Sequence, residues 1–228
     1  MNKIKFNLII TASLFLVFIL FTVAVMVVDV NAIGPKGSEV GLSAINAFFA
    51  NKIGFNKGIY KLSEVLGYVT FLVIAGFAGL GIYQLIKRKC ICKVDISILL
   101  LGCFYVLVFA CYFLFEIVEI NYRPILFDEG ELEASYPSSP TLLSLCVMSS
   151  AIIVIKDIFS NKKPIVIASY VGDGLLMALT VIGRLLAGVH WFSDIVAGIL
   201  LSAALISAFY TALSYAKEKF CSKCSSNE

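Results

Sequence analysis

Six long stretches of apolar residues, almost free of charge, constrain this chain more than any other feature. They run approximately over 8–28, 65–86, 96–118, 142–155, 165–182 and 195–213. A helix needs about 20 mostly apolar residues to cross the roughly 30 Å hydrocarbon core of a bilayer. The fourth stretch is short, and it reaches this length by beginning within 136–140 or by continuing toward Ile158. The pattern predicts an all-α bundle of six transmembrane helices, with 1–228 forming a single integral membrane domain.

The composition excludes a soluble domain. Of the 228 residues, 60% are hydrophobic and only 14% are charged, and the mean hydropathy is +0.97. These values lie outside the range of ordinary soluble proteins. The formal net charge is +3. Because this small excess suits an anionic lipid surface, it gives no reason to expect a nucleic-acid partner.

Lysine and arginine residues gather in the short connections on one side of the predicted bundle. This side holds Lys3, Lys5, Lys87, Arg88, Lys89, Lys93, Lys156, Lys162, Lys163, Lys217, Lys219 and Lys223. Such an excess is typical of cytoplasmic loops. We therefore expect a multi-pass protein of the plasma membrane with both termini in the cytoplasm and a polar cytoplasmic tail over 216–228. The first apolar stretch is too long for a signal-peptide core, which favours an uncleaved helix.

The loop after the first span carries a helical pattern of its own. Apolar side chains recur at Leu42, Ile45, Phe49 and Ile53, and Gly54 follows as a stop signal. This spacing predicts an amphipathic helix that lies on the outer surface of the membrane.

The seven cysteines are open to more than one interpretation. Cys103, Cys111 and Cys146 fall in predicted spans, and we expect them to be small membrane-buried hydrophobic residues. The pairs Cys90/Cys92 and Cys221/Cys224 lie on the cytoplasmic side, where four thiolates suit zinc. Free or lipidated thiols are favoured over this alternative, and no metal site is predicted.

Asp173 lies in the middle of the fifth span between Gly172 and Gly174. An intramembrane carboxylate indicates a functional site by default. The alternative is a structural carboxyl group that bonds to a neighbouring helix at a close glycine contact. We favour the structural role, because Asp173 lies several turns from the outer ends of the helices.

Candidate catalytic residues lie in two of the predicted outer connections. His190 is the only histidine, and Asp194 follows it by four residues. On a helix this spacing lets the carboxylate hold one imidazole nitrogen and raise the basicity of the other. Arg123 and Arg184 carry the guanidinium groups that suit phosphate oxygens. The set suits nucleophilic attack on phosphorus, but taken alone these residues are more often ordinary interfacial anchors.

These residues resemble the motifs of the type 2 phosphatidic acid phosphatase (PAP2) superfamily. Its third motif has an arginine, five residues, a histidine, three residues and an aspartate, as at Arg184, His190 and Asp194. Its first motif ends in Arg-Pro, as at Arg123-Pro124. Its second motif, Pro-Ser-Gly-His, aligns with 137–140. The resemblance covers about 40–213.

The resemblance implies a metal-independent phosphatase that needs no cofactor. It implies that His190 forms a phosphohistidine and that Asp194 orients the imidazole. It further implies that Arg123 and Arg184 bind the phosphoryl group, assisted by backbone N–H groups and hydroxyls around Ser138 and Ser139. Substrates in the family are lipid phosphates and diphosphates at the membrane surface, here on the extracytoplasmic face.

The chain departs from the family pattern at two positions. Glu116 stands where the first motif carries a lysine, and we expect its carboxylate to pair with Arg123. Pro140 stands where the second motif carries the histidine that protonates the leaving group. Because the chain has no second histidine, Glu133 or a water molecule is the remaining candidate acid.

Loss of the acid affects substrates unequally. An alkoxide leaving group needs a proton, whereas a lipid diphosphate expels a lipid monophosphate, which is already a stable anion. We therefore expect a preference for diphosphates such as undecaprenyl diphosphate over phosphatidate. The alternative function is a catalytically inactive PAP2-like protein that binds lipid phosphate headgroups. A transporter is disfavoured, because the polar residues cluster at one membrane face.

Overall fold

The computed structural model describes the backbone of residues 3–127 and 130–225 and the side chains of 3–127 and 130–219. Within these residues the fold is all-α, with seven α-helices and two short 3-10 segments. The helices are α1 (Lys3–Val27), α2 (Ser43–Ile53), α3 (Lys57–Arg88), α4 (Ile96–Ile117), α5 (Ser139–Ile158), α6 (Lys163–Ala187) and α7 (Phe192–Ser225), and the 3-10 segments are η1 (Pro35–Gly37) and η2 (Ile91–Lys93). All of the α-helices except α2 are long and apolar enough to cross a membrane. The predicted six-span, all-α bundle is confirmed.

Helix ends differ from the predicted spans where local chemistry sets them. The short fourth span becomes α5 by extension at both ends, with Pro140 in its first turn, where a missing N–H costs no helical bond. Helix α3 begins at Lys57, because the Asn56 side chain accepts hydrogen bonds from the backbone N–H groups of Gly58 and Ile59. Helix α7 continues to Ser225, so most of the polar tail over 216–228 is helical.

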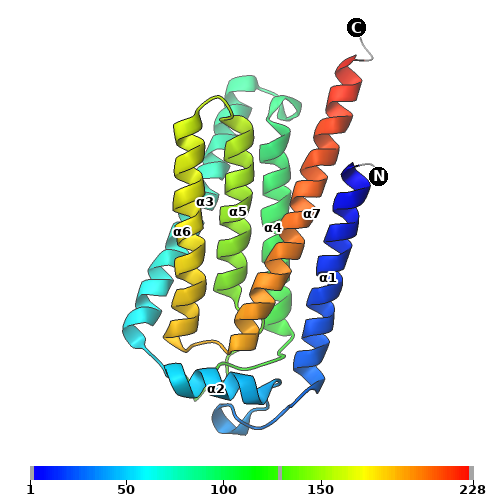
Figure 1. The fold of residues 1–228 in the computed structure, drawn as a ribbon. Helices are drawn as coiled ribbons and strands as arrows, with labels where there is room; N and C mark the ends of the chain where they lie inside the picture. The colour runs from blue at the N-terminus through cyan, green and yellow to red at the C-terminus, as the bar shows by residue number, and fades with distance from the viewer. Residues whose placement is uncertain (1–2, 128–129, 226–228) are drawn as a thin grey trace.

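Helix α5 is the centre of the bundle and contacts α3, α4, α6 and α7, while α1 packs along α7 (Figure 1). Half of the apolar window of α5 and of α7 is buried, against 6% for α3. The apolar faces of the outer helices are therefore the surface that meets lipid. Both chain termini lie at one end of the bundle, here called the terminal end, and α2 crosses the opposite end, here called the α2 end (Figure 1).

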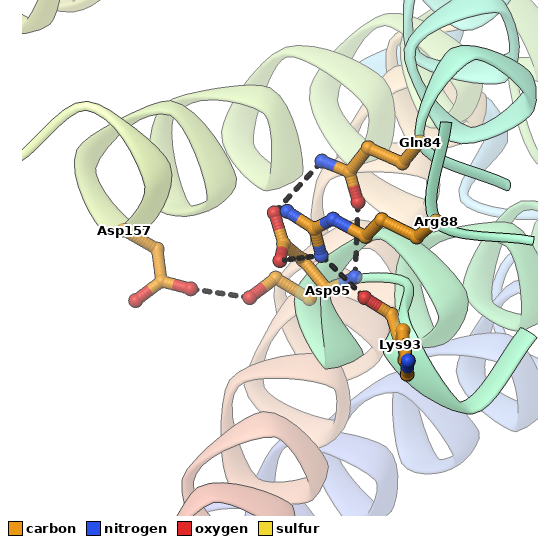
Figure 2. Close-up of polar contacts among 6 residues, drawn as sticks. Gln84, Arg88, Lys93, Asp95 and Asp157 are labelled. Atoms are coloured by element: carbon orange, nitrogen blue, oxygen red, sulfur yellow. Dashed lines mark hydrogen bonds and ion pairs between the residues drawn. The ribbon is translucent and has the colours of Figure 1, made fainter. Parts of the chain in front are cut away.

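The terminal end is held by ion pairs and hydrogen bonds between helices (Figure 2). Asp95 Oδ1 lies 2.7 Å from Arg88 Nη1, and Asp95 Oδ2 accepts a 2.7 Å hydrogen bond from Gln84 Nε2. Arg88 also donates to the carbonyl of Lys93, which closes the η2 connection. Asp157 contacts both the Ser97 hydroxyl and the Lys217 ammonium group, so α5 is tied to α4 and α7.

The three cysteines in the spans differ in how far the bundle covers them. Cys146 is buried and Cys111 is half-buried, whereas Cys103 is exposed on the outside of α4. Cys90 and Cys92 are free thiols at the terminal end, and the side chains of Cys221 and Cys224 lie outside the described residues. Among the residues that the structure describes, no group of three or more potential metal ligands occurs.

Asp173 does not sit at a close glycine contact. Its carboxylate accepts a 2.6 Å hydrogen bond from Ser169, which lies one turn earlier on the same helix. No atom of another described element lies within 4 Å of the place where a Cβ would stand on Gly172 or Gly174. The expected bond to a neighbouring helix is replaced by this bond within α6.

The predicted surface helix is present as α2 and ends at Gly54, which has a φ of 66°. Its Phe49 ring stacks on Phe192 at the start of α7, with ring centroids 4.3 Å apart. Its Ile45 and Phe48 side chains are exposed, which leaves an apolar edge at the end of the bundle. Helix α2 therefore covers the first turn of α7 rather than standing apart from the spans.

Candidate active site

The connection between α4 and α5 positions the first group of site residues. Its two arms pair in antiparallel fashion at Tyr122 and Ala134. The Arg123 N–H donates to the Glu133 carbonyl at 3.0 Å, and the Ser135 N–H donates to the Asn121 carbonyl at 2.8 Å. These bonds fix the backbone on which the side chains of Asn121, Arg123 and Ser135 stand.

The connection between α6 and α7 positions His190. Gly188 ends α6 with a φ of 65°, and a Cβ there would lie 2.1 Å from the Gly54 carbonyl oxygen, so only glycine fits. Trp191 Nε1 donates to the Tyr122 carbonyl at 2.6 Å, which ties this connection to the α4–α5 loop. His190 lies before α7 and not on it.

Asp194 is fully buried and accepts hydrogen bonds from residues of several elements. Its Oδ2 accepts from Ser135 Oγ at 2.6 Å and from the Trp191 N–H at 2.9 Å. Its Oδ1 accepts from Asn121 Nδ2 at 3.0 Å, and its backbone carbonyl accepts from the Ser138 N–H at 2.9 Å. A buried carboxylate needs such donors, since an unpaired one is costly to remove from water.

The imidazole of His190 is held by Ser135 rather than directly by Asp194. His190 Nδ1 lies 3.0 Å from Ser135 Oγ and 3.2 Å from the Ser135 carbonyl oxygen. The expected direct contact with Asp194 is replaced by contact through the Ser135 hydroxyl. Burial, reinforced by the positive charges of Arg123 and Arg184, holds the pKa of His190 well below its usual value of 6.5. The neutral imidazole is therefore the form present near neutral pH.

The two predicted arginines converge on the same end of the bundle through a pair of aromatic rings. The Arg184 guanidinium lies 5.5 Å from the Tyr60 ring, and the Arg123 guanidinium lies 5.3 Å from the Phe127 ring. The Tyr60 and Phe127 rings are themselves in contact, with centroids 5.3 Å apart. Cation–π contacts of this kind hold a guanidinium without using its N–H donors.

Three polar atoms of the site are buried and have neither a hydrogen-bond partner nor an ion-pair partner among the described residues. They are Arg123 Nη1, Arg184 Nε and His190 Nε2. Buried polar groups are normally paired, so unpaired ones need an explanation. Arginine donors near an unpaired imidazole nitrogen are groups that suit the oxygens of a tetrahedral anion.

The carboxylate that pairs with Arg123 is not the one that the sequence predicted. Arg123 Nε lies 3.1 Å from Glu133 Oε2, so Glu133 and not Glu116 is its ion-pair partner. Glu116 instead accepts a 3.3 Å hydrogen bond from Ser139 Oγ, next to Pro140. The expected Glu116–Arg123 pair is wrong, because Arg123 stands beyond the end of α4 on an arm that pairs with 133–135.

The hydroxyl groups of the second motif already have partners. Ser138 is fully buried, and its Oγ lies 3.0 Å from Thr141 Oγ1. The Ser139 hydroxyl is the one that donates to Glu116. What this segment offers to an anion is therefore the N-terminus of α5, where the first backbone N–H groups have no helical acceptor.

Two small cavities with mostly apolar walls adjoin the site. One of about 160 Å³ has His190 in its wall, together with Phe49, Phe55, Ile125 and Trp191. The other, of about 180 Å³, has Arg184 and Pro140 in its wall, together with Tyr68, Phe71 and Leu143. The polar site is thus flanked by apolar space.

The structure is a six-span helical bundle that gathers the buried His190, the buried Arg184 and the half-buried Arg123 at one end. The sequence profile of the PAP2 superfamily matches residues 104–218, and the chain belongs to this superfamily. The fold is shared with a crystal structure of a transmembrane PAP2 type phosphatidylglycerolphosphate phosphatase from Bacillus subtilis, with a TM-score of 0.61 and 18% sequence identity. That similarity covers 90% of this chain and 96% of the other. No curated protein matches the sequence.

Sequence reasoning missed the residues that hold the site in place. Ser135 and Asn121 have no periodic signal, and only their nearness to the motif residues Pro137 and Arg123 marks them. Tyr60 lies in the first turn of α3, where an aromatic residue is equally typical of a membrane interface.

Proposed function

We propose that the protein is a membrane-bound lipid phosphatase or diphosphatase that works through a phosphohistidine on His190. The unpaired Nε2 of His190, buried with the unpaired Arg123 Nη1 and Arg184 Nε, carries this proposal. Membership of the PAP2 superfamily and the fold shared with a PAP2 type phosphatase support it. The chain's own residues supply the nucleophile and the phosphate donors, and no metal or cofactor enters the proposal.

The reaction has two steps. In the first, the lone pair of His190 Nε2 attacks phosphorus, the N–P bond forms, and the bond from phosphorus to the leaving oxygen breaks. In the second, water attacks the phosphohistidine, the N–P bond breaks, and the water proton passes to solvent as inorganic phosphate is released. Arg123 and Arg184 donate hydrogen bonds to the equatorial oxygens, whose charge is spread in the transition state.

The substrate is an amphiphile with a terminal phosphate, because apolar cavities adjoin both His190 and Arg184. Pro140 occupies the place of a histidine acid, and proline cannot donate a proton. A leaving group that is already a stable anion needs no acid, so we propose a prenyl diphosphate such as undecaprenyl diphosphate as the preferred substrate. Phosphatidate is the slower substrate on this argument.

The orientation of the site is part of the proposal. The lysine-rich connections lie at the terminal end, whereas the α4–α5 and α6–α7 connections, which carry the site residues, lie at the α2 end of the bundle (Figure 1). By the positive-inside rule the terminal end is cytoplasmic. The site therefore faces the outside of the plasma membrane.

The test is phosphate release by the purified protein in detergent. Undecaprenyl diphosphate, phosphatidate and phosphatidylglycerolphosphate are assayed in parallel, with His190→Ala as the blank and its melting temperature as the control for folding. We expect release that disappears in His190→Ala and is fastest with the diphosphate. Equal release by His190→Ala would exclude the phosphohistidine route. No release from any substrate by the native chain, with binding of lipid phosphate retained, would favour a headgroup-binding protein instead.

A further inference from the structure

We infer that Ser135 is a positioning residue. Its hydroxyl group links Asp194 to His190 by hydrogen bonds, and this link keeps the imidazole hydrogen on Nδ1. The role of His190 as nucleophile rests on the proposed function, whereas the proton arrangement is a property of the ligand-free protein. Ser135 is 3% exposed and stands between the two residues, 3.0 Å from His190 Nδ1 and 2.6 Å from Asp194 Oδ2.

Only one arrangement of hydrogen-bond donors satisfies both contacts of the Ser135 hydroxyl group. A serine hydroxyl has one hydrogen to donate, and an ionised carboxylate can only accept. The 2.6 Å contact with Asp194 Oδ2 therefore takes the Ser135 hydrogen. The Ser135 oxygen is left as an acceptor for His190 Nδ1, so the hydrogen of that bond must come from Nδ1.

A second acceptor favours the same tautomer. The backbone carbonyl of Ser135 lies 3.2 Å from His190 Nδ1 and cannot donate. Both neighbours of Nδ1 are thus acceptors, and a bare Nδ1 would face two oxygens without a hydrogen between them. In the neutral ring the hydrogen on Nδ1 leaves the lone pair on Nε2, which is the buried nitrogen with no partner among the described residues.

Asp194 is fixed independently of His190, which is what lets Ser135 act as a relay. Its carboxylate is held by Asn121 Nδ2 at 3.0 Å and by the Trp191 N–H at 2.9 Å. With those bonds set, one position remains for the Ser135 hydroxyl hydrogen. The carboxylate therefore orients the serine, and the serine orients the ring.

The arrangement also serves the covalent state. When Nε2 carries a phosphoryl group, the ring holds its remaining hydrogen on Nδ1 and becomes positively charged. The Ser135 oxygen, with its own hydrogen committed to Asp194, stays an acceptor for that charged N–H. Hydrogen bonds to a charged group are stronger than those to a neutral one, so the contact gains strength as the phosphohistidine forms.

Nuclear magnetic resonance of the ligand-free protein tests the tautomer directly. Because His190 is the only histidine, ¹⁵N-histidine labelling reports on this residue alone. In the native chain we expect a protonated signal for Nδ1 and an unprotonated one for Nε2. In Ser135→Ala the backbone carbonyl remains an acceptor for Nδ1 but the closer hydroxyl acceptor is lost, so we expect the fraction with the hydrogen on Nε2 to rise. Ser202→Ala is the matched control, a buried serine on α7 whose hydroxyl bonds to the Gly198 carbonyl inside the bundle.

A double-mutant cycle separates the relay from a merely structural role. Asp194→Asn should shift the tautomer ratio in the native background and add little in the Ser135→Ala background. Independent effects of the two changes, or an unchanged ratio in Ser135→Ala, would overturn the inference. If phosphate release is detected, Ser135→Ala should slow it by about tenfold through lost orientation. If no release is detected, the proposed function fails while the tautomer result still decides the role of Ser135.

Discussion

Asn46 on α2 and Ser193 in the first turn of α7 hold each other through two hydrogen bonds. Asn46 Oδ1 accepts from the Ser193 N–H at 3.0 Å, and Asn46 Nδ2 donates to Ser193 Oγ at 2.9 Å. Asn46 is fully buried, although it stands on a surface helix. The side chain therefore caps α7 one residue before Asp194, and α2 becomes part of the framework of the site.

We predict that Asn46→Ala destabilises the protein by about 1–3 kcal/mol, because it leaves the buried Ser193 N–H without its acceptor. A loss of that size lowers the Tm by about 2–10 °C in a chain of this length. Asn51→Ala is the matched control on an exposed position of the same helix. Thermal unfolding in detergent compares the two variants, and equal Tm values would show that the contact contributes nothing.

The bundle was predictable from hydropathy because a membrane span leaves a signal in every residue of its length. The central helix α5 was the hardest span, since it is interrupted by serine and proline and buries half of its apolar window. The convergence of Arg123, Arg184 and His190 was also predictable. All three stand just beyond or within the last turn of a span, and topology places those ends on one side of the membrane.

The contact between His190 and Asp194 was mispredicted because helix capping overrode the four-residue spacing. Gly188 ends α6, and Asp194 accepts from the Trp191 N–H, so α7 begins at Phe192 and His190 stays outside it. Ser135 then reaches His190 through the pairing of two loop arms. Such long-range loop contacts carry no periodic pattern, which is why the sequence did not reveal them.

We predict that the His190 imidazole stays neutral as the pH falls through 6.5. Burial and the charges of Arg123 and Arg184 disfavour the protonated form and lower its pKa. The nucleophilic form therefore persists on acidification, and the acid limb of kcat/KM that belongs to His190 lies below pH 6.5. ¹⁵N titration of His190 measures this pKa in the free protein. Arg123→Gln should raise the pKa and Lys36→Gln, an exposed change at the same end, should not.

We predict that Glu133→Gln slows phosphatidate hydrolysis more than hydrolysis of undecaprenyl diphosphate. Glu133 lies 3.1 Å from Arg123 Nε, so a phosphoryl group bound to Arg123 comes next to a carboxylate that can take up and pass on a proton. The amide cannot do this, and general acid help is worth about a hundred- to ten-thousandfold. The ratio of the two turnover rates is the measurement. An equal loss with both substrates would assign Glu133 to holding Arg123 alone.

We predict that Glu116→Lys lowers KM for an anionic lipid substrate. The change replaces a negative charge with a positive one beside Ser139 and Pro140, at the start of α5. Glu116 is exposed, so the gain is modest, on the order of 1 kcal/mol or about fivefold in KM. Glu39→Lys makes the same charge change at an exposed position of the same end. A matching fall in KM in both variants would mean that general surface charge, rather than this position, acts on the substrate.

We predict that Pro140→His accelerates phosphatidate hydrolysis more than that of a lipid diphosphate. Position 140 lies in the first turn of α5, where a restored backbone N–H has no intrahelical acceptor to disturb and the helix is preserved. Arg184 and Pro140 share the wall of one cavity, so an imidazole there stands beside the phosphate donors. A proton on that imidazole stabilises an alkoxide leaving group and is of little use to a departing lipid monophosphate. The measurement is the turnover of both substrates in Pro140→His and in Pro140→Gln. Because glutamine cannot deliver a proton, a gain seen only in Pro140→His is due to acid catalysis and not to a change in the shape of the site. An equal gain in the two variants would mean that proline restricts the site sterically and that the missing acid is not what limits the reaction.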